Sequence, residues 1–104
     1  MSEPTSKAPL ILAVDDDFVT LQLAQDMLTD EGFEVITAVD GESALTLFSQ
    51  ATTENRPFEV VLLDVEMPGL NGYQVCERIR ALPNGSNIPI IMISGREDLE
   101  AAKR

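Results

Sequence analysis

The sequence predicts an α/β protein with a doubly wound parallel sheet. Short, continuous apolar runs alternate along the chain with stretches of helical periodicity. Continuous apolar runs are typical of strands that are buried on both faces of a parallel sheet. The alternation indicates helices that cross over between parallel strands with a right-handed connection. Two of the runs, at residues 10–14 and 60–63, also end in carboxylates, which points to a functional edge of the sheet.

The first third of the chain predicts a tail, a strand and a helix. Residues 1–8 are mostly polar and are expected to form a flexible tail, so the domain is expected to span residues 9–104. The apolar run 10–14 predicts the first strand. Residues 17–31 then show a helical pattern, and Gly32 is expected to end that helix. The apolar stripe that predicts the buried face comprises Phe18, Leu21, Ala24, Met27 and Leu28.

The middle of the chain repeats this order. Residues 33–38 predict the second strand, and Asp40-Gly41 predicts a turn. A second helix ending near Ala51 follows from the spacing of Ala44, Leu45 and Phe48. Residues 52–57 are polar and contain a proline, which predicts a loop.

The last part of the chain adds two strands and two helices. Residues 58–63 predict the third strand, and the turn-rich segment 67–72 connects it to a helix over 73–81 that buries Val75, Cys76 and Ile79. Residues 82–87 break that helix, and 88–93 predict the fourth strand. A final helix is expected to begin near Glu97 and to be cut off at Arg104.

Composition excludes several classes of function. The formal net charge of −11 opposes binding to nucleic acid phosphates and suits a cation or a basic partner. The chain has no histidine, so an imidazole base or a histidine metal ligand is excluded. No apolar stretch approaches the about 20 residues that span a bilayer. The lone Cys76 excludes an internal disulfide and suits a reducing cytoplasm.

The acidic strand ends predict a metal site with phosphoryl chemistry. Asp15, Asp16, Asp64 and Ser94 follow strands, and ligands of such folds bind at the carboxyl ends of strands where the strand order reverses. Magnesium prefers oxygen ligands and can neutralise an approaching phosphoryl group. An aspartate can then act as nucleophile and form an acyl phosphate.

Each of these residues also has a plainer interpretation. Asp15 and Asp16 can be a solvated strand end, and Asp64 can simply cap its strand. Ser94 fits a turn former, and the side chain of Glu66 is expected in solvent although its backbone carbonyl can reach an ion. Asp17 is expected to be a helix N-cap rather than a metal ligand. The combination, rather than any single residue, predicts the site.

Taken in order, these segments resemble the receiver domain of bacterial two-component response regulators. The resemblance is carried by residues 11–17, by 61–72 with Asp64 and the Met67-Pro68-Gly69 turn, by 40–44, and by 88–95. It covers roughly residues 9–104. It implies a flavodoxin-like receiver fold with strand order 2-1-3-4, followed in the family by a fifth strand and a fifth helix that this chain does not contain.

The resemblance also implies roles for the acidic residues. Asp64 would be the phosphoacceptor, and Asp15 and Asp16 would hold Mg²⁺ together with Asp64 and the backbone carbonyl of Glu66. The hydroxyl of Ser94 would bind the phosphoryl oxygens as the switch residue. The donor would be a phosphohistidine on a sensor histidine kinase or a histidine phosphotransfer protein.

Two departures from the family bear on these roles. The family's lysine partner has no counterpart here, because Lys7 lies in the tail and Lys103 in the final helix. An uncovered fourth strand or fourth helix is expected to favour a homodimer or a helix swap. Two alternative functions stay open: an interaction module in which Asp64 is never phosphorylated, and an aspartate-nucleophile phosphatase with Glu66 as its second acid.

Overall fold

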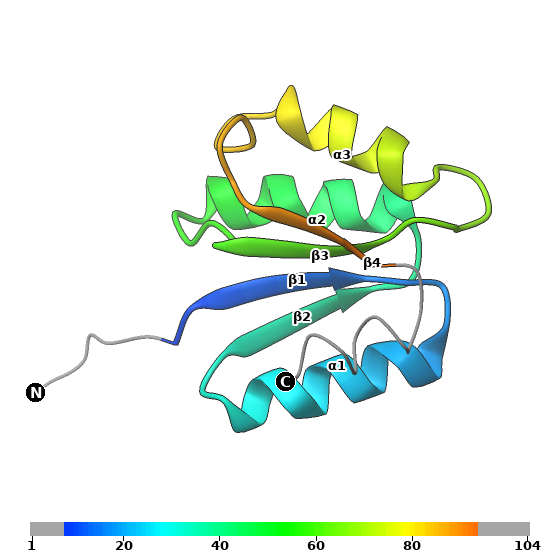
Figure 1. The fold of residues 1–104 in the computed structure, drawn as a ribbon. Helices are drawn as coiled ribbons and strands as arrows, with labels where there is room; N and C mark the ends of the chain where they lie inside the picture. Colours follow the sequence, from blue (N-terminus) through cyan, green and yellow to red (C-terminus); the bar gives the residue numbers. More distant parts are fainter. Residues whose placement is uncertain (1–7, 94–104) are drawn as a thin grey trace, which may run out of the picture.

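The structure, a computed structural model, describes residues 8–93 and consists there of four strands alternating with three helices (Figure 1). The alternation agrees with the apolar runs and helical stretches of the sequence. The strands are β1 (Leu10–Val14), β2 (Glu34–Ala38), β3 (Val60–Asp64) and β4 (Ile90–Ile93), and the helices are α1 (Phe18–Asp30), α2 (Gly41–Thr53) and α3 (Gly72–Arg80).

The strands form one parallel sheet in the order β2-β1-β3-β4, as the sequence predicts. Helix α1 covers one face of the sheet, whereas α2 and α3 lie side by side on the other face (Figure 1). The chain therefore winds in one direction from β1 to β2 and in the opposite direction from β3 to β4. The carboxyl ends of β1 and β3 meet at the point where the winding reverses.

The core consists of two layers, because side chains along a strand point alternately to opposite faces. On β1, Leu10, Leu12 and Val14 belong to the layer under α2 and α3, whereas Ile11 and Ala13 belong to the layer under α1. This explains why β1 is apolar at every position and buried throughout. Within residues 8–93, no helix combines the length and apolarity that a bilayer crossing requires.

Several boundaries differ from the sequence predictions by one or two residues. Helix α2 continues to Thr53, so the predicted loop begins two residues later than expected. Strand β3 includes Asp64 but begins at Val60, and β4 begins at Ile90. Phe58 and Ile88 are buried apolar residues that precede the paired residues of β3 and β4, so the apolar runs are longer than the strands.

The predicted buried face of α1 was wrong at Phe18, and Met27 and Leu28 are half-buried rather than buried. Phe18 is 71% exposed, whereas Leu21 and Ala24 are buried as expected. Phe18 is the first residue of the helix and lies beyond the end of β1, so it does not face the sheet. Gly32 follows the helix with a φ of +94°, a conformation that favours glycine, and confirms the predicted helix end.

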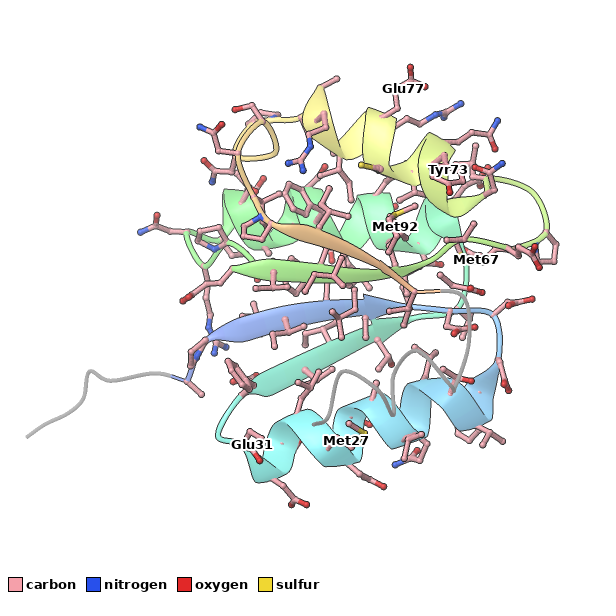
Figure 2. All side chains as sticks on the ribbon, viewed as in Figure 1. Met27, Glu31, Met67, Tyr73, Glu77 and Met92 are labelled. Atoms are coloured by element: carbon pink, nitrogen blue, oxygen red, sulfur yellow. The ribbon has the colours of Figure 1, made fainter. Side chains whose placement is uncertain are left out.

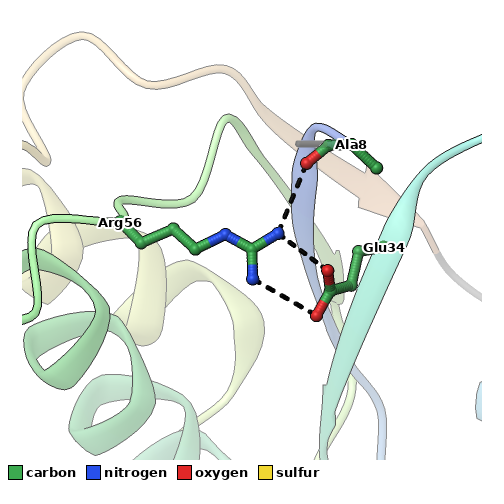
Figure 3. Close-up of polar contacts among 3 residues, drawn as sticks. All are labelled: Ala8, Glu34 and Arg56. Atoms are coloured by element: carbon green, nitrogen blue, oxygen red, sulfur yellow. Dashed lines mark hydrogen bonds and ion pairs between the residues drawn. The ribbon is translucent and has the colours of Figure 1, made fainter. Parts of the chain in front are cut away.

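The side chain of Arg56 links β2 to the residue that precedes β1, at the amino ends of the strands. The guanidinium of Arg56, in the connection between α2 and β3, donates to both carboxylate oxygens of Glu34 on β2, at 2.7 and 3.3 Å (Figure 3). It also donates to the backbone carbonyl of Ala8 at 3.4 Å. This contact lies at the amino ends of the strands, whereas the acidic residues lie at the carboxyl ends, so it supports the fold rather than the candidate site.

Candidate functional site

The register of the sheet places Asp15 and Asp64 beside each other. Val14 on β1 pairs with Leu63 on β3, and each of these residues is followed directly by an aspartate. The side chains of Val14 and Leu63 belong to the core layer under α2 and α3. Because side chains alternate along a strand, the two aspartates turn toward the opposite side, where α1 begins. Adjacent parallel strands thus bring together two acids that are 49 positions apart in sequence.

Asp16 completes a cluster of three carboxylates. One carboxylate oxygen from each of Asp15, Asp16 and Asp64 lies within 4.8 Å of the others. Asp15 and Asp64 are 4% and 7% exposed, whereas Asp16 is open to solvent. The cluster therefore has two buried acids at its base and one acid at its mouth.

A backbone hydrogen bond holds Asp15 in place. The amide of Asp17 donates to the Oδ1 atom of Asp15 at 2.8 Å. Asp17 is itself fixed as the N-cap of α1, where its carboxylate accepts from the amide of Val19 at 3.1 Å and from the hydroxyl of Thr20 at 2.8 Å. The start of α1 thus orients the first acid of the cluster, and the predicted N-cap role of Asp17 is confirmed.

Burial and repulsion make the ionised forms of the two inner acids unfavourable. Desolvation raises the pKa of Asp15 to about 7, against the opposing effect of the Asp17 amide and with added repulsion from Asp64 and Asp16. Desolvation also raises the pKa of Asp64, while the amide of Glu66 acts in the other direction. Perturbed carboxyl groups gathered at the end of a sheet are typical of functional sites, and a cation would relieve their repulsion.

The connection from β3 to α3 shapes the surroundings of Asp64. The amide of Glu66 lies 3.4 Å from the Oδ1 atom of Asp64. Met67 turns into the core, and both Met67 and Met92 lie on the side of the sheet that α2 and α3 cover (Figure 2). A shallow hollow of about 470 Å³ opens between this connection and the first turn of α3, beside exposed Tyr73.

The structure brings together three of the residues that the sequence singled out, namely Asp15, Asp16 and Asp64. The side chain of Glu66 is exposed, as expected. Ser94 lies outside the described residues, as do Lys7, Lys103 and the predicted final helix. Residues 1–8 are predicted to form a flexible tail, and of these the structure describes only Ala8.

Sequence reasoning missed two residues that support the cluster. Thr20 is buried and bonds to Asp17, but a search for apolar periodicity passes over a threonine. Gly72 packs directly against the backbone of Asp64, and the sequence offers only the general signal that a glycine can mark a close approach of two backbones.

The fold and the cluster define the class of this protein. It is a doubly wound α/β domain with a carboxylate site at the switch point of its sheet. Residues 11–104 match the family model of the response regulator receiver domain. The chain belongs to this family, which acts in two-component phosphorelay signalling.

Curated relatives agree with this assignment. The chain is 40% identical over 93 residues to the transcriptional regulatory protein PrrA of Mycobacterium tuberculosis, covering 89% of this chain and 37% of PrrA. It is 44% identical over 89 residues to the probable transcriptional regulator ycf27 of Cyanophora paradoxa, covering 86% of this chain and 34% of that protein. The chain thus spans little more than a third of the length of these relatives.

Solved structures show the same fold. Chemotaxis response regulator CheY4 of Vibrio cholerae matches 90% of this chain and 74% of its own with a TM-score of 0.73 and 32% identity. The receiver domain of the histidine kinase CKI1 from Arabidopsis thaliana, solved in complex with Mg²⁺ and BeF₃⁻, matches 91% of this chain and 72% of its own with a TM-score of 0.77 and 29% identity. These likenesses agree with the predicted flavodoxin-like fold and strand order.

Proposed function

We propose that this chain accepts a phosphoryl group on Asp64 with the assistance of Mg²⁺. The observation that carries the proposal is the cluster of three carboxylates, within 4.8 Å of one another, at the switch point of the sheet. Family membership supports phosphorelay signalling and does not favour the two alternatives, an interaction module that is never phosphorylated or an aspartate-nucleophile phosphatase. Of the three acids, Asp64 is the one that ends β3 at the base of the cluster.

The donor set fits magnesium. Mg²⁺ binds oxygen ligands at about 2.0–2.1 Å in an octahedron, so its ligand oxygens lie about 3–4 Å apart. The carboxylate oxygens of Asp15, Asp16 and Asp64 need to close by only a fraction of that spacing to meet one ion. The proposed ligands are these carboxylates and the backbone carbonyl of Glu66. When bound, the ion supplies positive charge that offsets the repulsion among the acids and the charge of an incoming phosphoryl group.

Asp64 supplies the nucleophile. One of its carboxylate oxygens forms a bond to phosphorus while the bond between phosphorus and the imidazole nitrogen of a donor histidine breaks. The products are an acyl phosphate on Asp64 and a donor histidine that has taken up a proton. Asp15 and Asp16 would hold the ion beside it, and the Asp17 amide keeps the carboxylate of Asp15 oriented.

Two further roles complete the proposal. The hydroxyl of Ser94, which follows β4 in sequence, donates to the phosphoryl oxygens after transfer. Neither Lys7 nor Lys103 is assigned the role of the family's lysine partner. Of the side chains assigned here, Ser94 would therefore be the one that binds the acyl phosphate, and a bound Mg²⁺ would supply positive charge next to it.

The proposed partner is a protein that carries a phosphohistidine, either a sensor histidine kinase or a histidine phosphotransfer protein. This chain contains no histidine, so the phosphohistidine has to come from another protein or from another part of a longer chain. A relative 39% identical over 93 residues is the sensor protein GacS of Pseudomonas syringae, which supports a place in such a pathway. The proposed location is the cytoplasm, and the proposed partners include neither nucleic acid nor membrane at this domain.

A phosphorylation assay tests the proposal. The chain is incubated with Mg²⁺ and acetyl phosphate, a small phosphodonor, and its intact mass is followed over time. The proposal expects one added phosphoryl group that requires Mg²⁺, disappears slowly and is absent from the Asp64→Asn variant. Rapid repeated turnover of added phosphoesters would instead support a phosphatase, and the absence of both modification and Mg²⁺ binding would support an interaction module.

We also propose that the 104-residue chain by itself forms a homodimer through β4. In the described part of the chain β4 pairs with β3 alone, and Ile91 on β4 is 50% exposed. A strand edge of this kind can pair with a second copy. Sedimentation equilibrium at moderate salt, which screens the net charge of −11, is expected to show a dimer. A well-folded monomer would contradict this proposal and leave the phosphorylation proposal intact.

A further inference from the structure

Gly72 lies where a side chain has no room. It is the first residue of α3, and a β-carbon built on it would lie 2.9 Å from the Cα atom of Val65 and closer still to the carbonyl oxygen of Asp64. Real β-carbons essentially never approach other heavy atoms within 3.0 Å. Gly72 lacks the positive φ found at Gly32 and Gly69, so the position requires glycine for space and not for conformation.

The atoms that such a β-carbon would meet are backbone atoms held in the sheet. The amide of Val65 donates to the carbonyl of Ile93 on β4 at 2.9 Å, and the amide of Gly72 donates to the carbonyl of Val65 at 3.0 Å. The peptide that joins Asp64 to Val65 therefore cannot move away from α3 without disturbing the pairing of β3 with β4. An adjustment that leaves α3 in place has to move this peptide, and with it the Cα atom of Asp64 that carries the carboxylate.

A small shift at this point matters for chemistry. Catalytic and metal-binding groups have to be held within about 0.5 Å of their productive positions. One carboxylate oxygen from each of Asp64, Asp15 and Asp16 lies within 4.8 Å of the others, so small movements decide whether all three can reach one ion. Displacement of the Asp64 backbone would change the position of one acid relative to the two acids that β1 and the start of α1 hold.

We propose that Gly72 is a positioning residue for phosphoryl transfer: its bare Cα sets how closely α3 approaches Asp64 and thereby where the Asp64 carboxylate lies in the cluster. This inference rests on the proposed function of Asp64. Gly72 touches neither the ion nor the phosphoryl group and acts only through the backbone of Asp64.

Gly41 provides a matched control on the same side of the sheet. A β-carbon on Gly41 would meet the Cγ2 atom of Val75 at 2.6 Å and the Cβ atom of Leu70 at 2.9 Å. Both neighbours are side-chain atoms of the core layer under α2 and α3, and neither belongs to the carboxylate cluster. Gly41→Ala and Gly72→Ala thus both introduce a crowded methyl group, but only Gly72→Ala presses on the backbone of a cluster acid.

The test measures Mg²⁺ affinity by isothermal titration calorimetry and phosphoryl uptake from acetyl phosphate at saturating Mg²⁺. Wild type, Gly72→Ala and Gly41→Ala are compared in enough trimethylamine N-oxide to keep destabilised variants folded, with their melting temperatures recorded. We expect Gly72→Ala to weaken Mg²⁺ binding by about tenfold or more, as displacement of supporting groups does at other metal sites. We expect Gly41→Ala to lower the melting temperature while Mg²⁺ affinity and uptake stay near the wild-type values.

Each other outcome is decisive. Equal losses of Mg²⁺ affinity in both variants, or no loss in Gly72→Ala, would overturn the inference. Failure of Gly72→Ala to fold where Gly41→Ala folds would also overturn it, because Gly72 would then serve the fold as a whole. Wild-type protein that binds Mg²⁺ but takes up no phosphoryl group would contradict the proposed function, and the Mg²⁺ affinities alone would then decide the role of Gly72.

Discussion

Asp15 and Asp64 are acids that the fold buries at a cost. Their carboxyl groups lose water, repel each other and receive only partial compensation from backbone amides of the following turns. Such a cost persists where a site needs ionised groups close together, and a bound cation changes the balance. The charge state of this pair should therefore be visible in the stability of the whole protein.

The stability of the metal-free protein should depend on pH. The pKa of Asp15 is raised from 3.8 to about 7, and that of Asp64 is raised too, so the folded state holds more protons than the unfolded state between these values. Without Mg²⁺, the free energy of unfolding should fall as pH rises from about 4 to about 7 and level off above that. Melting temperatures in metal-free buffer across this range measure the effect. Asp15→Asn should flatten the slope, and a melting temperature that rises through this window would contradict the assignment.

Mg²⁺ should reverse that dependence. The ion binds ionised carboxylates, so the rise in melting temperature that it causes should be small at pH 5 and large at pH 8. Calorimetric scans with and without Mg²⁺ at the two pH values measure the difference. The same shift at both pH values, or a full shift in Asp64→Asn, would show that the ion stabilises the protein from another place.

The acidic residues of the site were easier to predict from the sequence than the residues that hold them in place. Asp15, Asp16 and Asp64 were found because acids that end apolar runs stand out from their surroundings. Thr20 was missed because apolar periodicity gives no sign of the hydrogen bond from its hydroxyl to the N-cap residue Asp17. Phe18 was misplaced because periodicity alone does not show that the first turn of α1 extends past the end of the sheet.

The elements follow from the sequence because each carries its own local signals. Strand β1 is apolar at every position since both of its faces are covered, and α3 begins at a capping box in which Asn71 and Gln74 satisfy each other's backbone amides, both at 2.9 Å. Phe58 is buried but precedes the residues of β3 that pair with other strands, so the apolar run predicted a start of β3 that was too early. Packing between elements, which decides such cases, is not a local property.

The capping box at the start of α3 should contribute measurably to stability. Asn71→Ala removes the acceptor for the amide of Gln74 and should lower the free energy of unfolding by about 1 kcal/mol. For a domain of this size that corresponds to a melting temperature lower by about 4–8 °C. Gln74→Glu is the control, since glutamate serves equally well in a capping box. Urea unfolding measures both variants, and equal stability of wild type and Asn71→Ala would show that the cap adds nothing.

The whole molecule combines a stable scaffold with a site at the place where its winding reverses. The two core layers hold the sheet from both faces. Arg56 contacts Glu34 on β2 and Ala8 before β1, at the amino ends of these strands (Figure 3). Acids at the ends of adjacent strands are then brought together by the topology itself. The fold and the acid cluster were predictable because they depend on patterns repeated along the chain, whereas the fit of Gly72 against Asp64 depends on the packing of two particular backbones.

The core layer under α2 and α3 should limit the stability of the whole domain. Phe48 is 1% exposed and stacks on Phe58 with ring centroids 6.2 Å apart. Phe48→Ala should cost about 3–5 kcal/mol, a large share of the 5–15 kcal/mol typical of a folded domain. Phe48→Leu should cost much less because it keeps most of the buried volume. Urea unfolding curves compare the two, and a loss below about 1 kcal/mol in Phe48→Ala would contradict this view of the core.

The most direct test of the account is to locate the phosphoryl group chemically. Protein treated with Mg²⁺ and acetyl phosphate is reduced with borohydride, which converts an aspartyl phosphate to homoserine, and is then digested and sequenced by tandem mass spectrometry. The account predicts homoserine at position 64, dependent on Mg²⁺, with Asp15 and Asp16 unchanged. Homoserine at position 15 or 16, or at no position in protein that binds Mg²⁺, would contradict the assignment of Asp64 as the phosphoacceptor.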